Sequence, residues 1–236
     1  MGANLEMTAL RALGRLAAVA LLVLAGCGND PTTSDLRDPI RMVGAALKAR
    51  NAARNAPTLA SLGPDAVAVL RTALEKDGQP ILLVANTPLG FAGLMAPYGQ
   101  NGNVRTWATE QYVTLSTRDD ILVATRGFGP DLMSAVAPSL AQVSAGRGTL
   151  NRRYYYLDGA DQRQVFDYTC SLAREGGETI VILGKSYAAS RIAESCSGPA
   201  GSFVNRYWFD NRHILRQSEQ FLVPGVGTLL LQRVID

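Results

Sequence analysis

Cys27 carries the most specific chemistry that the sequence indicates. Two arginines, Arg11 and Arg15, precede an apolar run of eleven residues that ends at Gly26. A membrane-spanning helix needs about 20 apolar residues, so this shorter run fits the core of a signal peptide. The tetrapeptide Leu-Ala-Gly-Cys that ends the run resembles a bacterial lipobox, in which small residues fit the signal-peptidase cleft and the thiol takes a diacylglyceryl group. We predict a lipoprotein signal peptide over residues 1–26 and lipidation of Cys27; the alternative is an ordinary secretory signal with a chance cysteine.

Lipidation of Cys27 would decide where the protein resides. Each buried acyl CH₂ contributes about 0.8 kcal/mol, so two or three acyl chains hold a protein stably on a membrane. Gly28 follows the cysteine where an aspartate would be the retention signal, and in enteric-type bacteria this favours the outer membrane. Residues 27–38 are polar and turn-rich, which is typical of a flexible tether. We predict that residues 39–236 form one β-rich domain, held by the lipid at the periplasmic face of the outer membrane.

The composition is that of an ordinary globular protein, and it excludes several functional classes. The chain has 236 residues, of which 47% are hydrophobic and 18% are charged, and its net charge is +3. A charge this small, without a basic block, argues against nucleic acid as a partner. A single histidine, His213, argues against a zinc hydrolase, and a serine hydrolase would need that residue beside a serine and a carboxylate. We predict no catalytic residues, no metal and no cofactor.

Cys170 and Cys196 are the two cysteines that remain after Cys27. Both lie in strand-like segments, and an oxidising periplasm permits them to pair. We predict a disulfide between them; the alternative is two buried free thiols. A bridge across this separation would stabilise the fold by roughly 3–4 kcal/mol in the chain-entropy model.

Turn signals after Pro80 predict a sheet of antiparallel strands. They recur at intervals of about 10–14 residues, and no long helix intervenes. We predict a mainly β (α+β) fold, a large antiparallel meander of about nine to ten strands, curled or half-barrel-like, with two to four helices packed on it. The helices are expected over residues 39–54 and 65–76, and in two pieces within residues 130–143. A turn is expected at residues 175–177. A strand is expected over residues 186–196, with a helix as the alternative because of the alanines there.

Trp107, Arg126 and Asp131 form a candidate sugar-binding cleft. A tryptophan face stacks on a pyranose ring, and arginine and aspartate satisfy hydroxyls through charge-assisted hydrogen bonds. The favoured alternative is structural: a core tryptophan, an ion pair between Arg126 and Asp131, and Asp131 as the cap of a following helix.

Two aromatic strands supply further candidates for contact with a glycan or a partner. Tyr207 and Phe209 are expected on one face of their strand and Trp208 on the other. Exposure of Trp208 would indicate a partner or glycan surface, and burial on both faces is the alternative. The basic and aromatic run Arg152–Tyr156 indicates either a half-exposed strand or a surface for an acidic polysaccharide.

Residues 101–133 and 170–220 carry motifs of a known family. The first stretch has a tryptophan near a turn, a threonine with a glycine two residues on, and then Asp-Leu; these are Trp107, Thr125, Gly127, Asp131 and Leu132. The second has Cys170, Glu194-Ser195-Cys196, the segment Asn205–Asp210 and the segment Arg216–Gln220. With the lipobox, these motifs make the sequence similar to the YjbF family, the group 4 capsule polysaccharide lipoproteins (GfcB-like), over about residues 36–235. The resemblance implies an envelope lipoprotein made alongside capsule or exopolysaccharide export machinery, a meander sheet with few helices, and no established catalytic residues.

These observations lead to one functional hypothesis and one alternative. The hypothesis is an outer-membrane lipoprotein that acts as a non-enzymatic accessory in exopolysaccharide or capsule assembly or secretion. Its partners would be a polysaccharide-export outer-membrane protein, other periplasmic export subunits, or the polysaccharide itself. The alternative is a periplasmic carrier of an apolar ligand, similar to lipoprotein-sorting half-barrels. A lined apolar cavity would support the carrier, and a concave face filled by Trp107, Tyr154, Tyr156 and the helices would oppose it.

Overall fold

The computed structural model describes residues 63–129, 131–158, 160–223 and 226–236. The predicted signal peptide, Cys27, the tether and the helix expected over residues 39–54 lie outside the described residues. In chain order, the elements are α3 (Pro64–Asp77), β1 (Ile81–Asn86), β2 (Phe91–Asn101), β3 (Val104–Ala108), β4 (Thr114–Arg118), β5 (Ile121–Arg126), β6 (Ser134–Val136), α4 (Leu140–Ala145), β7 (Arg147–Leu157), β8 (Arg163–Ile182), β9 (Lys185–Gly198), β10 (Gly201–Asp210), β11 (Leu215–Val223) and β12 (Gly227–Ile235).

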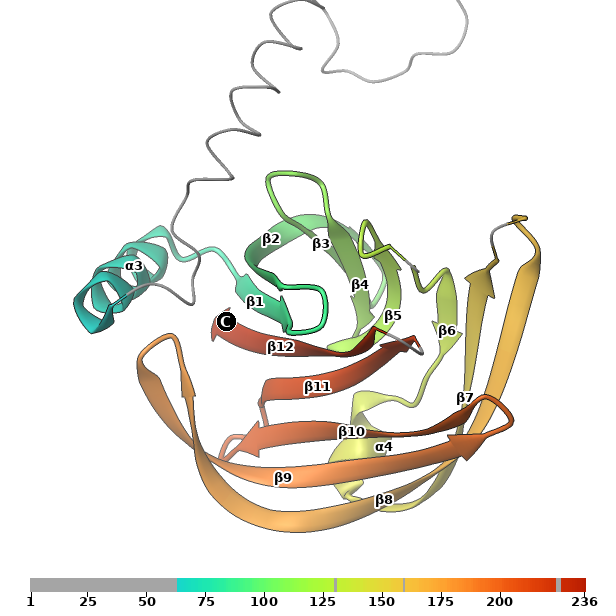
Figure 1. Cartoon of the computed structure of the whole chain (residues 1–236). Coiled ribbons are helices and arrows are strands. Elements are labelled where there is room, and N and C mark those ends of the chain that lie inside the picture. Colours follow the sequence, from blue (N-terminus) through green and yellow to red (C-terminus); the bar gives the residue numbers. More distant parts are fainter. Residues whose placement is uncertain (1–62, 130, 159, 224–225) are drawn as a thin grey trace, which may run out of the picture. The chain divides into compact units, whose positions relative to one another are not determined.

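The strands form one antiparallel sheet in the order β5-β4-β3-β2-β1-β12-β11-β10-β9-β8-β7-β6. It consists of two meanders that are joined where the first strand, β1, pairs with the last, β12 (Figure 1). The sheet curls until its edge strands β5 and β6 come together, where the backbone N–H of Thr125 donates to the carbonyl of Leu132 over 2.8 Å. The curled, mainly β meander is therefore confirmed. The described residues form twelve strands, where nine to ten were predicted, and they contain two helices. The sheet is closer to closure than a half-barrel.

Two local predictions are wrong, for reasons visible in the backbone. Within residues 130–143, Ser134–Val136 form the strand β6 instead of part of a helix, because Ala135 turns inward and the segment pairs with β7. Only the second piece is helical: Ser139 begins α4 with a capping box that it shares with Gln142. Residues 175–177 make no turn. The long strand β8 passes through them with a register shift between Arg174 and Gly176, whose φ of 107° suits glycine.

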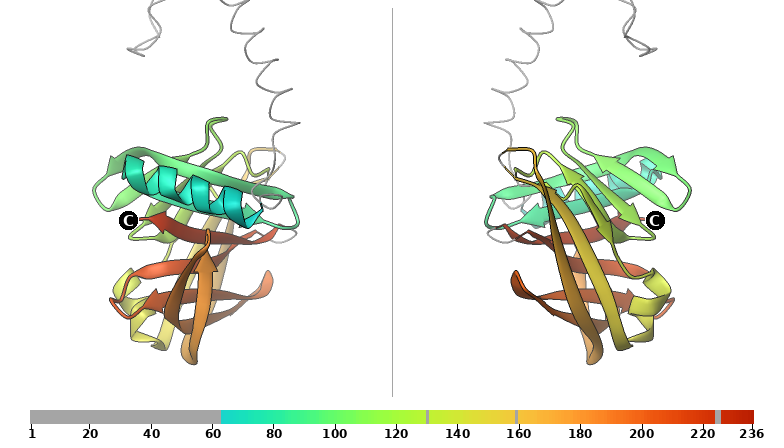
Figure 2. Two further views of the ribbon diagram at one scale, coloured as in Figure 1. Left: turned by 90° about the vertical axis from the view of Figure 1, so that its left-hand side faces the viewer. Right: turned by 90° about the vertical axis from the view of Figure 1, so that its right-hand side faces the viewer.

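Helix α3 confirms the helix predicted over residues 65–76 and packs on the outer face of the sheet. Pro64 occupies its first turn, and Gly78 ends it with a φ of 72°. Leu74 contacts an outer cluster of residues from β1, β8, β9, β10 and β12. Figure 2 shows the helix alongside the strands, outside the curl of the sheet. The cluster consists of Ile81, Ile180, Ile182, Ala189, Trp208 and Val234.

The inner face of the sheet is filled by side chains. Tyr154 lies at the centre of an aromatic group whose other members include Tyr156, Tyr168, Phe203 and Phe221. The rings of Phe203 and Phe221 stack with their centroids 4.1 Å apart. Helix α4 contributes Val143 to a second buried group beside the first. Aromatic burial of this kind supplies most of the stabilisation of a small domain.

Cys170 and Cys196 face each other in register on β8 and β9, and they form a disulfide inside the core. Both are almost fully buried among the aromatic side chains. The bridge links the two longest strands of the described part, so it ties the β6–β8 side of the sheet to the β9–β12 side.

Candidate functional site

A polar cavity of about 230 Å³ lies where the β2–β3 and β4–β5 turns approach β12. Eight residues line it: Gln100, Asn103, Arg105, Trp107, Thr117, Asp119, Asp120 and Arg233. Five come from strands β2, β3 and β4 and the β2–β3 turn, two come from the β4–β5 turn, and Arg233 comes from the last strand. The pairing of β1 with both β2 and β12 brings these distant segments together.

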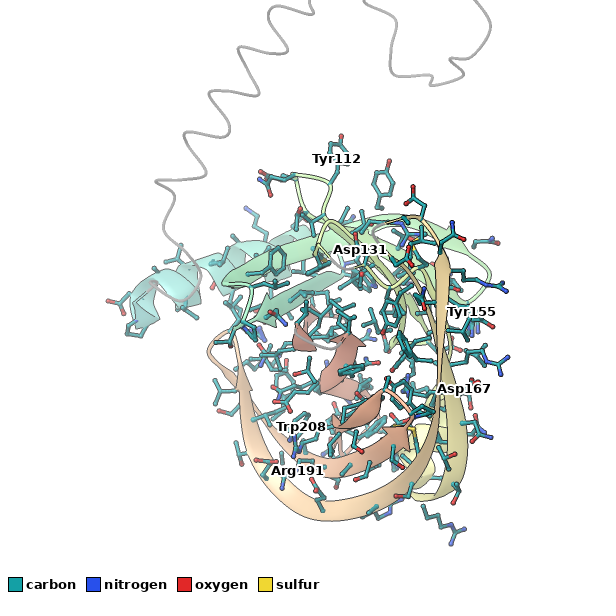
Figure 3. The ribbon with its side chains drawn as sticks, turned by 45° about the vertical axis from the view of Figure 1, so that its right-hand side comes forward. Tyr112, Asp131, Tyr155, Asp167, Arg191 and Trp208 are labelled. Atoms are coloured by element: carbon teal, nitrogen blue, oxygen red, sulfur yellow. A yellow bond between two sulfur atoms is a disulfide. The ribbon has the colours of Figure 1, made fainter. Side chains whose placement is uncertain are left out.

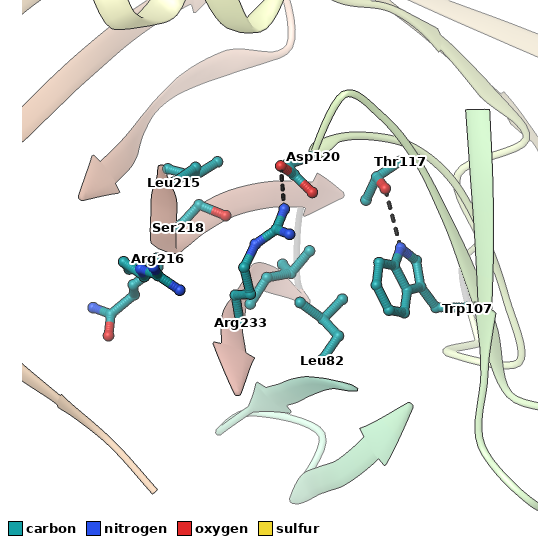
Figure 4. Close-up of a pocket in the computed structure, with 10 residues that line it drawn as sticks. Leu82, Trp107, Thr117, Asp120, Leu215, Arg216, Ser218 and Arg233 are labelled. Atoms are coloured by element: carbon teal, nitrogen blue, oxygen red, sulfur yellow. Dashed lines mark hydrogen bonds and ion pairs between the residues drawn. The ribbon is translucent and has the colours of Figure 1, made fainter. Parts of the chain in front are cut away.

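Trp107 forms the inner wall of this cavity and is only 3% exposed. Its indole N–H donates to the hydroxyl of Thr117 over 3.1 Å, which satisfies the one polar group of the ring (Figure 4). The guanidinium of Arg105 lies over the ring at 5.3 Å from its centroid. Trp107 therefore packs in the core and also forms one wall of the cavity.

The β4–β5 turn presents two consecutive carboxylates to the cavity. Asp119 and Asp120 have φ values of 48° and 69°. A two-residue hairpin turn with both φ values positive is one in which Asn-Gly is the preferred sequence. The carboxylate of Asp119 accepts a hydrogen bond from the amide of Asn103 over 2.9 Å, and Asp120 forms an ion pair with Arg233 (Figure 4).

A buried glutamine fixes this turn to the core. The side-chain amide of Gln220 donates to the backbone carbonyl of Asp120 over 3.0 Å, and its carbonyl accepts from the backbone N–H of Leu122 over 2.8 Å. Because Gln220 lies on β11, the turn is held against the opposite side of the sheet. The carboxylates are therefore placed by the fold as well as by their own hairpin.

A smaller cavity of about 20 Å³ adjoins the first. It shares Trp107, Thr117, Asp120 and Arg233 with the first cavity. Its other lining residues are Leu82, Leu215, Arg216, Gln217, Ser218 and Leu231. The two together form a cleft, called the Trp107 cleft below, that is polar at its mouth and more apolar at its base.

A family model described as group 4 capsule polysaccharide lipoprotein gfcB, YjbF, matches residues 46–234. The chain belongs to the YjbF family. A search of curated proteins found no match. The crystal structure of the hypothetical lipoprotein YmcC from Escherichia coli K12 has the same fold, with a TM-score of 0.60 and 16% sequence identity over 72% of this chain and 95% of that chain.

Residues of the first YjbF motif join the edge strands β5 and β6, a contact called the seam below. Trp107 of the same motif lines the Trp107 cleft. Asp131 accepts hydrogen bonds from the backbone N–H groups of Gly127 and Phe128, over 2.8 and 3.1 Å, and from the hydroxyl of Thr125 over 3.0 Å. Arg126 donates to the carbonyl of Leu132 over 3.1 Å. Two structural predictions are thereby corrected: Asp131 caps the β5–β6 loop instead of a helix, and it accepts from backbone and hydroxyl groups instead of from Arg126.

The predicted contact residues of this YjbF protein do not form one site. Trp107 lines the cleft, whereas Arg126 and Asp131 lie at the seam. Trp208 is buried on the outer face, where its indole N–H donates to Glu178 over 2.7 Å. Arg191 pairs with the same carboxylate over 2.7 Å, so Glu178 bridges the indole of Trp208 and the guanidinium of Arg191 (Figure 3 labels Trp208 and Arg191). Tyr207 and Phe209 face the interior, as the alternation predicted.

The run Arg152–Tyr156 also alternates. Arg152, Tyr154 and Tyr156 are buried, while Arg153 and Tyr155 face outward (Figure 3 labels Tyr155). Sequence analysis missed that Arg152 is an interior residue paired with Glu194. The signal available was the strict alternation of this strand, which places Arg152 on the same face as two tyrosines.

Cys170, Glu194 and Cys196 are the one group of potential metal ligands among the described residues, with ligand atoms within 4.8 Å of one another. Both sulfurs are engaged in the disulfide, so neither is a thiolate that could bind a metal. His213 is exposed in the β10–β11 turn with a φ of 59°. No helix of the described residues has the length and apolar character needed to cross a membrane.

Proposed function

We propose that this protein is a lipid-anchored, non-enzymatic accessory of capsule or exopolysaccharide assembly or secretion, located at the periplasmic face of the outer membrane. The family match over residues 46–234 is the observation that carries the proposal. The lipobox that ends at Cys27 supports the anchor, and Gly28 after it supports the outer membrane. A protein of this kind acts by holding partners or polymer in place, which suits a body with a well-filled core.

The arrangement of polar groups favours a binding role over catalysis. The one histidine of the chain, His213, stands in a turn and takes no part in the Trp107 cleft. The cleft carboxylate Asp120 is paired with Arg233, and Asp119 is held by Asn103. These partners hold the carboxylates in place, which serves recognition of a ligand. The partners proposed are a polysaccharide-export outer-membrane protein, other periplasmic export subunits, and the polysaccharide.

The filled interior argues against the carrier of an apolar ligand. Trp107, Tyr154 and Tyr156 occupy the concave face and are at most 5% exposed. Helix α4 packs beside them through Val143. A ligand the size of an acyl chain would have to displace this aromatic group, at the cost of the contacts that hold the core together.

Deletion of the gene in its native host tests the proposal. We expect the amount of surface polysaccharide to fall, and we expect the intact gene on a plasmid to restore it. A Cys27→Ser variant that accumulates to the same level should not restore it, because the body would no longer be held at the membrane. Unchanged surface polysaccharide after deletion would contradict the proposal.

A further inference from the structure

We propose that the Trp107 cleft binds a single sugar ring of a glycan chain through Asp119 and Arg105. This inference rests on the proposed function, since it names what the accessory protein would hold. It is carried by the cavity, by the donors and acceptors that line it, and by the two groups that remain available for a ligand.

The lining of the cleft suits a polyhydroxylated ligand. Sugar hydroxyls both donate and accept hydrogen bonds, and they occur on adjacent carbons. Carboxylates accept, guanidinium groups donate, and amide side chains do both. Asp119, Arg105 and Gln100 supply all three kinds around the mouth. The volume of about 230 Å³ lies below the roughly 300–1,000 Å³ of sites for drug-sized molecules, so it suits one ring with its chain passing outside.

Two of the charged groups in the cleft are available for a ligand. Asp120 and Arg233 neutralise each other. Asp119 accepts through Oδ2 from Asn103, and its Oδ1 has no hydrogen bond among the described residues. Arg105 donates from Nε and Nη2 to the side-chain oxygen of Gln100 over 3.4 and 3.3 Å and makes no other hydrogen bond among the described residues, so three of its five donor positions remain for hydroxyls.

Trp107 supplies the apolar surface that a sugar ring also needs. The guanidinium of Arg105 lies over the indole in the free protein. A small rotation of this surface side chain toward a ligand would open the ring face to the C–H groups of a pyranose. The indole itself stays fixed, because its N–H is bonded to Thr117 inside the cleft.

The two tryptophans make a direct test possible. The chain contains Trp107 and Trp208 and no others. Their indole N–H groups donate to different partners on opposite faces of the sheet, Thr117 and Glu178. In a ¹H–¹⁵N correlation spectrum, binding in the cleft should shift the indole signal of Trp107 and leave that of Trp208 in place. A Trp208→Phe variant assigns the two signals.

The titration uses the full mature protein and defined probes: glucose, galactose, mannose, glucuronic acid, and the polysaccharide purified from the native host. We expect a saturable shift of the Trp107 signal with at least one of them. Absence of any such shift, or equal shifts of both indole signals, would overturn the inference.

Variants of the two available groups sharpen the test. Asp119→Asn keeps the turn, because asparagine tolerates positive φ, and Arg105→Ala leaves the carboxylates in place. Each should weaken saccharide binding by roughly 10- to 100-fold, the loss typical of a charge-assisted hydrogen bond. Arg163→Ala is the matched control, because it removes an arginine that lies over an aromatic ring, Tyr155, outside the cleft. Equal binding by Asp119→Asn, Arg105→Ala and the control would overturn the assignment.

The result of the saccharide titration can be distinguished from the result of the gene deletion that tests the proposed function. If gene deletion abolishes surface polysaccharide while no probe shifts the Trp107 signal, the protein acts in export without binding sugar in this cleft. If the Trp107 signal shifts while deletion has no effect on surface polysaccharide, the cleft binds sugar and the proposed role fails.

Discussion

Arg152 and Glu194 form a two-point ion pair in the interior of the curled sheet. The Nε and Nη2 atoms of Arg152 donate to the two carboxylate oxygens of Glu194 over 2.6 and 2.8 Å, and the two side chains are 1% and 0% exposed. Tyr207 and Asn205 each donate to Glu194 over 2.8 Å. A buried pair with all of its oxygens bonded specifies how β7, β9 and β10 align, although such pairs add little net stability over an apolar core.

Removal of one partner of this pair should be far more costly than removal of a surface pair. Glu194→Ala leaves the charge of Arg152 buried and unpaired, and we expect the free energy of unfolding to fall by about 3–5 kcal/mol. Arg153→Ala is the matched control. Arg153, the neighbour of Arg152 on β7, pairs with Asp167 in the same two-point geometry, but these two side chains are 49% and 59% exposed. The control should lose about 1 kcal/mol or less. Urea unfolding measures both, and equal losses would contradict the assignment.

The same pair predicts a pH dependence of stability. Burial opposes the charge of Glu194, but the charge of Arg152 and the hydrogen bonds from Arg152, Asn205 and Tyr207 outweigh it and lower the pKa of Glu194. The unfolded chain therefore takes up this proton at a higher pH than the folded chain. The stabilisation is present above the ordinary value of 4.5 and is lost as the pH falls through the lowered value.

Comparison with Glu194→Gln isolates this contribution. The pKa values of Asp158, Asp167 and Asp210 are also lowered, but those groups are present in both proteins and their effects cancel. The difference in unfolding free energy between the two proteins should be largest near neutral pH and should shrink in acid. A difference that does not change with pH would show that Glu194 is not ionised in the folded protein.

Local signals in the sequence were sufficient for most of the described elements of this fold and insufficient for its long-range contacts. Pro64 and Gly78 mark the ends of α3, and turn residues mark most of the strands, because these preferences act within a few residues. The strand β6 escaped prediction since three residues give too short a pattern. Residues 175–177 were predicted as a turn because they contain two consecutive glycines. In the structure these glycines accommodate a bulge in a strand that continues.

The candidate site illustrates the same limit. Of the residues that line the Trp107 cleft, only Trp107 was selected as a contact residue from the sequence. Arg233 pairs with Asp120, 113 positions away, because β12 closes onto β1. Glu194 meets Arg152 across 42 positions for a similar reason. A single sequence carries no local pattern for such pairs, and composition alone does not indicate which charges will be buried.

The Cys170–Cys196 disulfide should contribute to stability through the loop that it closes. For a sequence separation of 26 residues, the chain-entropy model gives roughly 3–4 kcal/mol. Replacement of both cysteines by alanine should lower the free energy of unfolding by about this amount, and a reducing agent should lower the melting temperature of the wild type but not of the variant. Equal melting temperatures of the wild type with and without reducing agent would contradict the prediction.

Gly198 is a position where any side chain should destabilise the sheet. A Cβ atom there would lie 2.2 Å from the carbonyl oxygen of Asp167 and 2.8 Å from the ring of Tyr168. Gly198→Ala must therefore displace β8, and we expect a loss of about 1–3 kcal/mol, as for other overpacked sites. Gly99→Ala is the control within a strand, because no atom lies within 4 Å of its Cβ position. Thermal unfolding should separate the two variants clearly.

Asp131 should control the seam between β5 and β6. Its carboxylate accepts from Gly127, Phe128 and Thr125, so Asp131→Ala leaves two backbone N–H groups and one hydroxyl without this partner. We expect a loss of about 1–3 kcal/mol in unfolding free energy and faster hydrogen exchange at Gly127 and Phe128. Glu110→Ala, an exposed acidic residue of the β3–β4 loop, serves as the control for loss of charge. If exchange at Gly127 and Phe128 is unchanged in Asp131→Ala, the carboxylate does not hold the seam, and the YjbF motif residue must have another role.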